Sequence, residues 1–143
     1  MILVDANILL YAYDSSSPEH AKARTWWERR LSLPEPILLA WVTLLAFIRI
    51  GTNSRALRTP MTIEEACGHV ASWLDRPMVR FAEPTEQHWA VLSRLLIDEH
   101  ASANLVTDAH LAALAMEHGA TLASSDRDFK RFPGLRWEDP LRS

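Results

Sequence analysis

Four aspartates border apolar segments of this sequence, and side chains of this type at such positions could assemble a metal site. Asp5 follows the apolar run Ile2–Val4, Asp108 stands at the start of an apolar stretch with helical periodicity, and Asp126 and Asp128 follow another short apolar run. Each could instead cap a helix or form a turn, since aspartate is common in both places. Carboxylates gathered from several element junctions would bind a hard cation.

Electrostatic repulsion decides what such a cluster needs. Two carboxylates about 4 Å apart repel by about 4 kcal/mol at an effective dielectric constant near 20. A group of three therefore requires a protonated carboxyl, a nearby Lys or Arg, or a bound cation. No Lys or Arg neighbours Asp5 or Asp108 in the sequence, while Arg127 follows Asp126. Oxygen ligands without thiolate favour Mg²⁺, with Mn²⁺ as an alternative, so Asp5, Asp108 and Asp126 are predicted metal ligands and catalytic residues.

Two further residues could support this site. Asp128 could reach the same cation, but a helix cap or a solvated position also explains it. Asn7 is better explained as a cap than as a ligand, and in a metal site it would orient Asp5 or a water molecule.

The elements that must position these residues alternate between short apolar runs and longer amphipathic stretches. Strands are predicted at residues 2–4, 37–40, 79–82 and 121–124, with a further edge strand at 135–137. Helices are predicted at residues 7–13, 18–31, 43–50, 63–74, 84–98 and 107–118, followed by one helical turn at 126–131. This alternation predicts an α/β fold, with a mostly parallel sheet of four to five strands covered by helices on both faces.

In parallel sheets of this kind, ligands bind beyond the carboxyl ends of the strands. Asp5 and Asp126 share that edge if the first and fourth strands are neighbours. Asp108 reaches it only if the predicted loop at residues 99–106 returns the chain there, which spacing alone does not determine.

Length and composition narrow the class of protein. A chain of 143 residues is expected to form a single domain over residues 1–143. Cys67 is the only cysteine and is assigned to packing, so no internal disulfide is expected and a reducing cytoplasm fits. We expect no signal peptide, and the longest apolar run, residues 37–48, is too short to span a membrane. A soluble cytoplasmic protein is therefore predicted.

Other chemistries have less support. The net charge of −3 does not indicate a general nucleic-acid coat, so bound nucleic acid would need local arginines or a cation. The motifs HExxH, GxGxxG, GxxxxGK[ST] and GxSxG do not occur. His110 and His118 are interpreted as helix-surface residues.

The segments MILVDANILLYAYD, TDAHLAALA and LASSDRDF together resemble a PIN domain, and more closely the VapC ribonuclease toxins of toxin–antitoxin modules. The resemblance extends over essentially the whole chain. It implies a three-layer α/β/α fold, Mg²⁺-dependent endoribonuclease activity, a homodimer, and a small VapB-type antitoxin that blocks the site. Asp5, Asp108 and Asp126 match the metal aspartates of the family.

The sequence departs from the family pattern at one position. The family usually has a glutamate on the helix that corresponds to residues 43–50. The candidate positions hold Leu44 and Phe47, and no acidic residue occurs between Glu35 and Glu64. A site with two metal ions is therefore in doubt, because fewer carboxylates remain to hold a second ion.

The leading hypothesis is an RNA-cleaving toxin whose Mg²⁺ activates a water molecule. Arg49, Arg55 and Arg58 could contact the RNA backbone, or could be surface residues or antitoxin contacts. One alternative is a PIN-like binding module with weak or no catalytic activity, which the missing glutamate motivates. Another is a phosphatase with an aspartate nucleophile, although that chemistry needs an acid where Asn7 stands.

Overall fold

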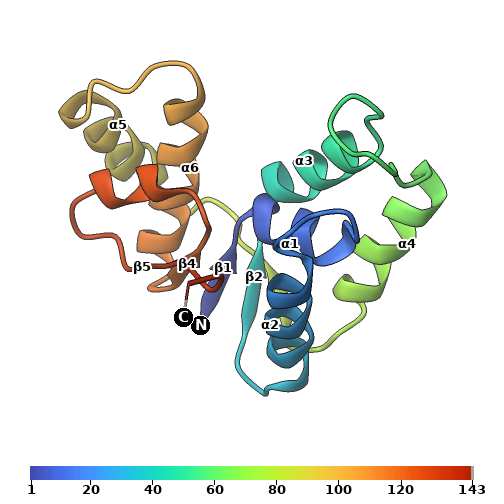
Figure 1. Cartoon of the computed structure of the whole chain (residues 1–143). Coiled ribbons are helices and arrows are strands. Elements are labelled where there is room, and N and C mark those ends of the chain that lie inside the picture. Colours follow the sequence, from blue (N-terminus) through green and yellow to red (C-terminus); the bar gives the residue numbers. More distant parts are fainter. Residues whose placement is uncertain (143) are drawn as a thin grey trace.

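In the computed structural model, which describes residues 1–142, five parallel strands form a central sheet in the order β3-β2-β1-β4-β5 (Figure 1). The strands are β1 (Ile2–Val4), β2 (Ile37–Leu39), β3 (Val79–Phe81), β4 (Thr121–Ala123) and β5 (Trp137–Glu138). The helices are α1 (Ala6–Tyr13), α2 (His20–Ser32), α3 (Trp41–Gly51), α4 (Ile63–Leu74), α5 (His88–Asp98) and α6 (Asn104–Glu117), followed by the 3₁₀ helix η1 (Arg127–Arg131).

The sheet separates two hydrophobic cores, because successive strand residues point to opposite faces. Ile2 and Val4 join the core formed with α1 to α4, whereas Leu3 joins the core formed with α5, α6 and η1. Figure 1 shows these two groups of helices on opposite sides of the sheet. The predicted α/β/α architecture and the parallel sheet are confirmed. Ser143, the predicted end of the domain, lies outside the described residues.

Local sequence signals account for several element boundaries. The Thr62 hydroxyl accepts a hydrogen bond from Glu65 N, and the Glu65 carboxylate accepts one from Thr62 N, so a capping box begins α4 where the sequence predicts a helix from residue 63. Gly119 follows the end of α6 with a φ of 65°, a left-handed conformation that glycine adopts at low cost. β1 pairs with β4, which places the ends of these two strands side by side.

Several predicted features differ from the structure, including the start of α2, at His20 rather than at residue 18, and that of α3, at Trp41 rather than at residue 43. Helix α6 begins at Asn104 rather than at residue 107, because Leu105 already packs against the second core; the preceding loop is correspondingly shorter. Helix α5 begins at His88 rather than near residue 84, because Thr85 is held by hydrogen bonds to Glu117. Cys67 is exposed on α4 and does not pack in the core. Among residues 1–142, no helix is long and apolar enough to cross a membrane.

Candidate metal centre

Asp5 lies at the junction of β1 and α1, where both of its carboxylate oxygens are engaged. Its Oδ1 accepts a hydrogen bond from Ala6 N at 2.8 Å, which caps α1, and its Oδ2 accepts one from the Ser124 hydroxyl at 2.7 Å. Burial is the main cause that raises the pKa of Asp5; the two hydrogen bonds oppose this shift, and the charge of Asp126 adds to it. The two hydrogen bonds thus fix the orientation of the carboxylate, while burial and the nearby charge of Asp126 disfavour its ionised form.

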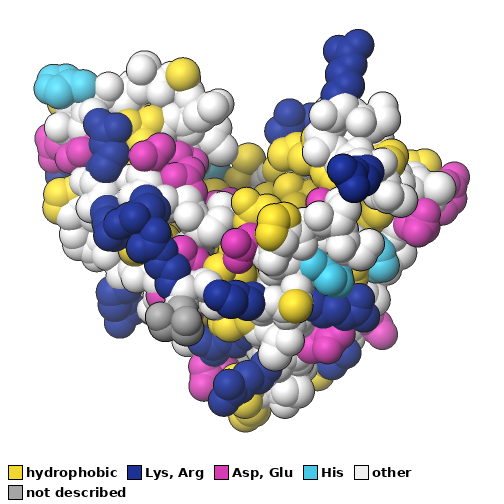
Figure 2. Space-filling view, in the orientation of Figure 1, with side chains coloured by type: hydrophobic (Ala, Val, Ile, Leu, Met, Phe, Trp, Pro, Cys, Tyr) yellow, Lys and Arg dark blue, Asp and Glu magenta, His cyan; other side chains and the backbone are white. Residues whose placement is uncertain are grey.

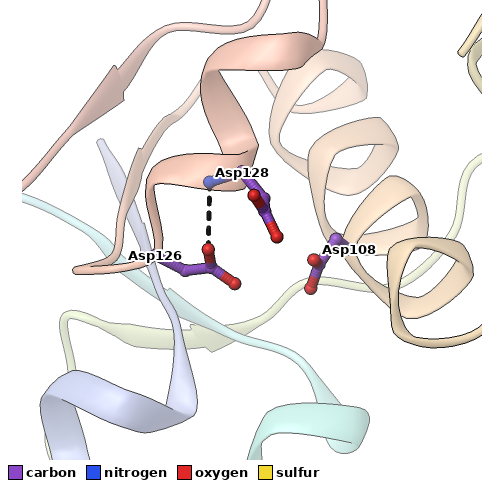
Figure 3. Close-up of side chains that lie close together, drawn as sticks. All are labelled: Asp108, Asp126 and Asp128. Carbon is purple, nitrogen blue, oxygen red and sulfur yellow. Dashed lines mark hydrogen bonds between the residues drawn. The ribbon is translucent and has the colours of Figure 1, made fainter.

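Three further carboxylates gather beside it. Asp108 lies on α6, one turn inside the helix, while Asp126 caps η1 and Asp128 lies in its first turn. One oxygen from each lies within 4.8 Å of the others, and Figure 3 shows the three side chains around a common space. Asp128 N donates a hydrogen bond to Asp126 Oδ1 at 2.9 Å, so the η1 cap also fixes the position of Asp126.

The electrostatics of this cluster favour a cation. The pKa of Asp108 is raised to about 6, mainly by burial and in addition by the negative charges of Asp126, Asp5 and Asp128. Within the described part of the chain, no Lys or Arg forms an ion pair with any of the four aspartates. The ligand atoms are all carboxylate oxygens, the kind that Mg²⁺ and Mn²⁺ prefer, so the residues present fit such an ion.

Helix α3 forms the opposite wall of a pocket of about 180 Å³ that contains Asp5 and Asp108. The α3 residues that line it are Val42, Thr43, Ala46 and Arg49. The positions suggested for the missing glutamate were wrong: Leu44 and Phe47 are fully buried in the core beneath α1 and α4. Ala46 is one of the α3 residues that line the pocket, so an acidic side chain there would lie in the same pocket as Asp5 and Asp108.

This arrangement of acids and fold agrees with a known family. Residues 2–135 match the family model described as the PIN domain. The chain is 44% identical to Ribonuclease VapC37 of Mycobacterium tuberculosis over 140 residues, which cover 98% of this chain and 97% of that protein. It belongs to the PIN-domain family, in its VapC group. A second relative, Ribonuclease VapC33 of the same species, is 37% identical over 142 residues, 99% of each chain.

Solved structures support the fold of this PIN domain. The crystal structure of VapC20 from Mycobacterium tuberculosis, named a Sarcin-Ricin loop cleaving toxin, matches with a TM-score of 0.67 and 19% identity, covering 95% of this chain and 99% of that one. VapBC2 from Rickettsia felis, bound to a DNA fragment from its promoter, matches with a TM-score of 0.68 and 18% identity, covering 96% and 98%. At these identities the likeness concerns the fold.

The predicted residues of this PIN domain therefore fall into two sets. Asp108, Asp126 and Asp128 form the close group, whereas Asp5 lies beside it in the pocket shared with Asp108. The interpretation of Asn7 as a cap was wrong, because Asp5 caps α1 and Asn7 lies inside that helix; Asn7 forms no hydrogen bond with these acids among the described residues. Its Nδ2 donates to Ser124 Oγ at 3.2 Å, so Asn7 acts on Asp5 through Ser124.

Sequence reasoning missed Ser124. This serine is fully buried, donates its hydroxyl proton to Asp5, and accepts hydrogen bonds from Asn7 Nδ2 and from Asp126 N, the latter at 3.0 Å. It therefore links the aspartate after β1 to the aspartate after β4. The available signal was a polar residue that directly follows an apolar strand and precedes an aspartate by two positions.

Proposed function

We propose that this chain is a Mg²⁺-dependent endoribonuclease, the toxin of a VapBC-type toxin–antitoxin pair, which hydrolyses phosphodiester bonds of RNA. The observation that carries the proposal is the group of Asp108, Asp126 and Asp128, which lies beside Asp5 and forms no ion pair with a Lys or Arg among residues 1–142. The relatives named ribonucleases match over nearly their whole length, which supports the same class of reaction.

The residues would divide the work as follows. A bound Mg²⁺ would supply a more acidic water molecule and positive charge opposite the phosphate. Asp108 and Asp126 would hold the ion, with Asp128 as a supporting ligand, and Asp5 would complete the site from β1. Ser124 and Asn7 keep the Asp5 carboxylate in one orientation through their hydrogen bonds. Because these contacts exist before substrate binds, the acidic groups would need little reorganisation during reaction.

Basic side chains near the pocket would bind the RNA backbone. Arg49 lines the pocket from α3 and is exposed, which places its charge across from Asp5 and Asp108. Arg55 and Arg58 are exposed in the segment between α3 and α4. Figure 2 shows a hollow between the lobe of α5 and α6 and the lobe of α3 and α4, with acidic side chains beside it and basic side chains on both lobes. A phosphate chain lying in the hollow would meet both kinds of charge.

The partners follow from the same assignment. Several structural neighbours are VapBC complexes, including one from Salmonella typhimurium bound to DNA, and these support a small VapB-type antitoxin as the partner of this chain. A homodimer and a cytoplasmic location belong to the same proposal. Expression of the chain without its antitoxin is expected to arrest growth, and co-expression with the cognate antitoxin is expected to restore it.

The decisive experiment compares wild type with Asp5→Asn on structured RNA in the presence of Mg²⁺. We expect wild type to cleave, EDTA to stop cleavage, and Asp5→Asn to lose it by about two to three orders of magnitude, as when one preorganised polar group is removed from an active site. Asp98→Asn is the matched control, because it makes the same exchange of a carboxylate oxygen for an amide nitrogen at an exposed aspartate on α5. Equal cleavage by wild type and Asp5→Asn that survives EDTA would exclude the mechanism.

The missing glutamate supports a second candidate, a PIN-fold binding module with weak or no activity. Ala46 lines the pocket that contains Asp5 and Asp108, and the site has one carboxylate fewer than the family pattern. Calorimetric Mg²⁺ binding without cleavage of any RNA would favour this candidate. A phosphatase has less support, because Asn7 supplies no general acid and is hydrogen-bonded to Ser124. Absence of an aspartyl-phosphate after incubation with a phosphodonor would exclude it.

A further inference from the structure

A pocket of about 420 Å³ lies between α2 and the C-terminal segment and is separate from the acidic pocket. This α2 pocket is lined by Ala21, Lys22, Thr25, Trp26, Arg29, Pro140, Leu141 and Arg142. Three of these side chains are cationic, one is an indole and none is acidic. The lining therefore suits a ligand that combines negative charge with a flat apolar group.

The spacing of residues along α2 separates this wall from the face that enters the core. The buried stripe of the helix consists of Ala23, Trp27 and Leu31. The stripe beside it, also at intervals of three or four residues, consists of Lys22, Trp26 and Arg29. Lys22 and Arg29 are exposed and Trp26 is half-buried, so α2 presents an indole between two cations to the α2 pocket.

The two cations of this stripe differ from the other cations of α2 in their partners. Arg24 and Arg30 are paired with glutamates at 2.9 and 3.0 Å. Neither Lys22 nor Arg29 forms an ion pair within residues 1–142, and Lys22 Nζ donates instead to Leu141 O at 3.4 Å. Figure 2 shows basic side chains over the part of the molecule where α2 lies. An anion in the α2 pocket would therefore meet charge that no carboxylate neutralises.

An adjoining pocket extends from the α2 pocket toward the metal centre. Its volume is about 270 Å³, and it shares Leu141 and Arg142 with the α2 pocket. Its lining also includes Ser125, which directly precedes Asp126. Asp139, an acidic residue of this lining, is paired with Arg142 at 3.4 Å. The two pockets together reach from α2 to the residue beside Asp126.

We propose that the α2 pocket binds single-stranded RNA at a nucleotide remote from the bond that is cleaved. The inference rests on the proposed function, because the bound strand is the substrate of the metal centre. The Trp26 indole provides a surface on which any base can stack, and the cations contact phosphate. The phosphate contacts are expected in the α2 pocket, because the adjoining pocket also contains Glu19. Contacts of these two kinds increase the affinity for RNA without selecting its sequence.

The test measures RNA binding in EDTA, where a metal ion contributes neither to binding nor to cleavage. The probe is a fluorescently labelled single-stranded RNA of about ten nucleotides, and anisotropy gives its Kd at several salt concentrations. Arg29→Gln should reduce the slope of log Kd against log salt concentration by about 0.7, which corresponds to one lost phosphate contact. Arg24→Gln is the matched control, because it makes the same exchange on the same helix at a cation that is paired with Glu28. It should leave the slope unchanged.

Variants of Trp26 test the stacking contact. Trp26→Leu should weaken RNA binding by about tenfold, whereas Trp26→Phe, which keeps an aromatic ring, should retain most of the affinity. Thermal unfolding of each variant checks the fold, because Trp26 also packs against the first core. In Mg²⁺, Arg29→Gln should raise the KM for RNA cleavage and leave kcat unchanged, because this contact binds substrate and transition state equally.

Three outcomes would overturn the proposal: no RNA binding by wild type in EDTA, equal losses of affinity in Arg29→Gln and Arg24→Gln, or wild-type affinity and slope in Arg29→Gln. If Arg29→Gln binds RNA normally but no longer binds the cognate antitoxin, the α2 pocket belongs to a protein partner instead. If Trp26→Leu unfolds, the exposed Arg29 decides the outcome. Absence of cleavage together with the expected RNA affinities would refute the ribonuclease proposal and leave the RNA site supported.

Discussion

Helix α6 carries a carboxylate near each of its ends, and the surroundings of the two shift their pKa values in opposite directions. Near its start, Asp108 faces other carboxylates, and its pKa is raised to about 6 by burial and by their charges. In the last turn, the Glu117 side chain is only 1% exposed. Burial alone would raise the pKa of Glu117, but hydrogen bonds from Thr85 and His88 outweigh it and lower the pKa.

The difference between the two carboxylates lies in their partners. Thr85 N and Thr85 Oγ1 donate to Glu117 Oε1 at 2.9 and 2.7 Å, and His88 Nδ1 contacts the other oxygen. His88 Nε2 in turn lies 2.9 Å from His110 Nδ1. Both carboxylate oxygens of Glu117 are thus engaged by other residues of the protein, and these contacts connect the start of α5 to α6. Among residues 1–142, no hydrogen-bond donor contacts the Asp108 carboxylate, so nothing offsets the effect of burial and of the neighbouring charges on its pKa.

His110 contacts His88 and so belongs to the contacts between α5 and α6; its interpretation as a helix-surface residue was wrong. It is half-buried between α5 and α6, and burial, followed by the charge of His88, lowers its pKa. His118 is also engaged, because its Nε2 lies 2.7 Å from the carbonyl oxygen of Glu83. Both histidines hold elements together.

The largest expected effect comes from exchanging a carboxylate for an amide at each end of α6. Asp108→Asn should lower RNA cleavage by about 10³-fold, because it removes a charge that is fixed in place for the reaction. It should raise the Tm of the metal-free protein, because it relieves repulsion from Asp126, Asp5 and Asp128. Initial cleavage rates and thermal unfolding in EDTA measure the two effects.

Glu117→Gln is the matched variant at the other end of the helix. It should keep cleavage near the wild-type rate and lower stability by about 2 kcal/mol, because hydrogen bonds to a charged group are lost or weakened. Loss of stability in Asp108→Asn, or loss of activity in well-folded Glu117→Gln, would remove the distinction between the two carboxylates.

A smaller effect is expected from pH. The folded-state pKa of Asp108, about 6, lies above its ordinary value of 3.8, so the folded protein binds the extra proton between these values. The metal-free protein therefore loses stability from this residue as pH rises from about 4 to 6 and beyond. The contribution of His110 to stability depends on pH in the opposite direction. Because folding lowers the pKa of His110, this contribution is present above pH 6.5 and is lost as pH falls.

The difference in unfolding free energy between Asp108→Asn and wild type isolates the contribution of Asp108 to the pH dependence of stability. Urea unfolding in EDTA should show that the advantage of Asp108→Asn is larger at pH 7.5 than at pH 5. Mg²⁺ binding should also weaken as pH falls below about 6, since the cation competes with a proton on Asp108. An advantage that is independent of pH, with Mg²⁺ affinity also unchanged, would contradict the raised pKa.

The smallest expected effect is that of Ala46→Glu, which sharpens the question of how many metal ions the pocket holds. The new carboxylate would lie in the same pocket as Asp5 and Asp108, so the Tm in EDTA should fall. Mg²⁺ affinity should rise by about threefold to tenfold through added charge attraction. Ala46→Gln is the neutral control of similar size. If both variants bind Mg²⁺ like wild type, Ala46 does not face the ion, and calorimetric stoichiometry shows whether a second ion enters.

Much of the fold could be predicted because its signals are local. The short apolar runs at residues 2–4 and 121–124 predicted strands, and the helix predicted at residues 63–74 matches α4. Their boundaries were accurate because periodicity and capping involve residues only a few positions apart. The start of α6 was missed, because the packing of Leu105 against the second core extends that helix into a stretch with polar residues.

The sequence by itself determined the alternation of strands and helices and the type of ligand that several aspartates could offer. Only the tertiary structure decided that Asp128 joins Asp108 and Asp126, that Ala46 lines the pocket of Asp108, and that Ser124 lies among these acids. The physical reason is distance along the chain. The Ser124–Asp5 hydrogen bond joins residues 119 positions apart, and its existence depends on the pairing of β1 with β4. Composition and spacing carry little information about such a pairing, because core packing fixes it through many weak contacts at once.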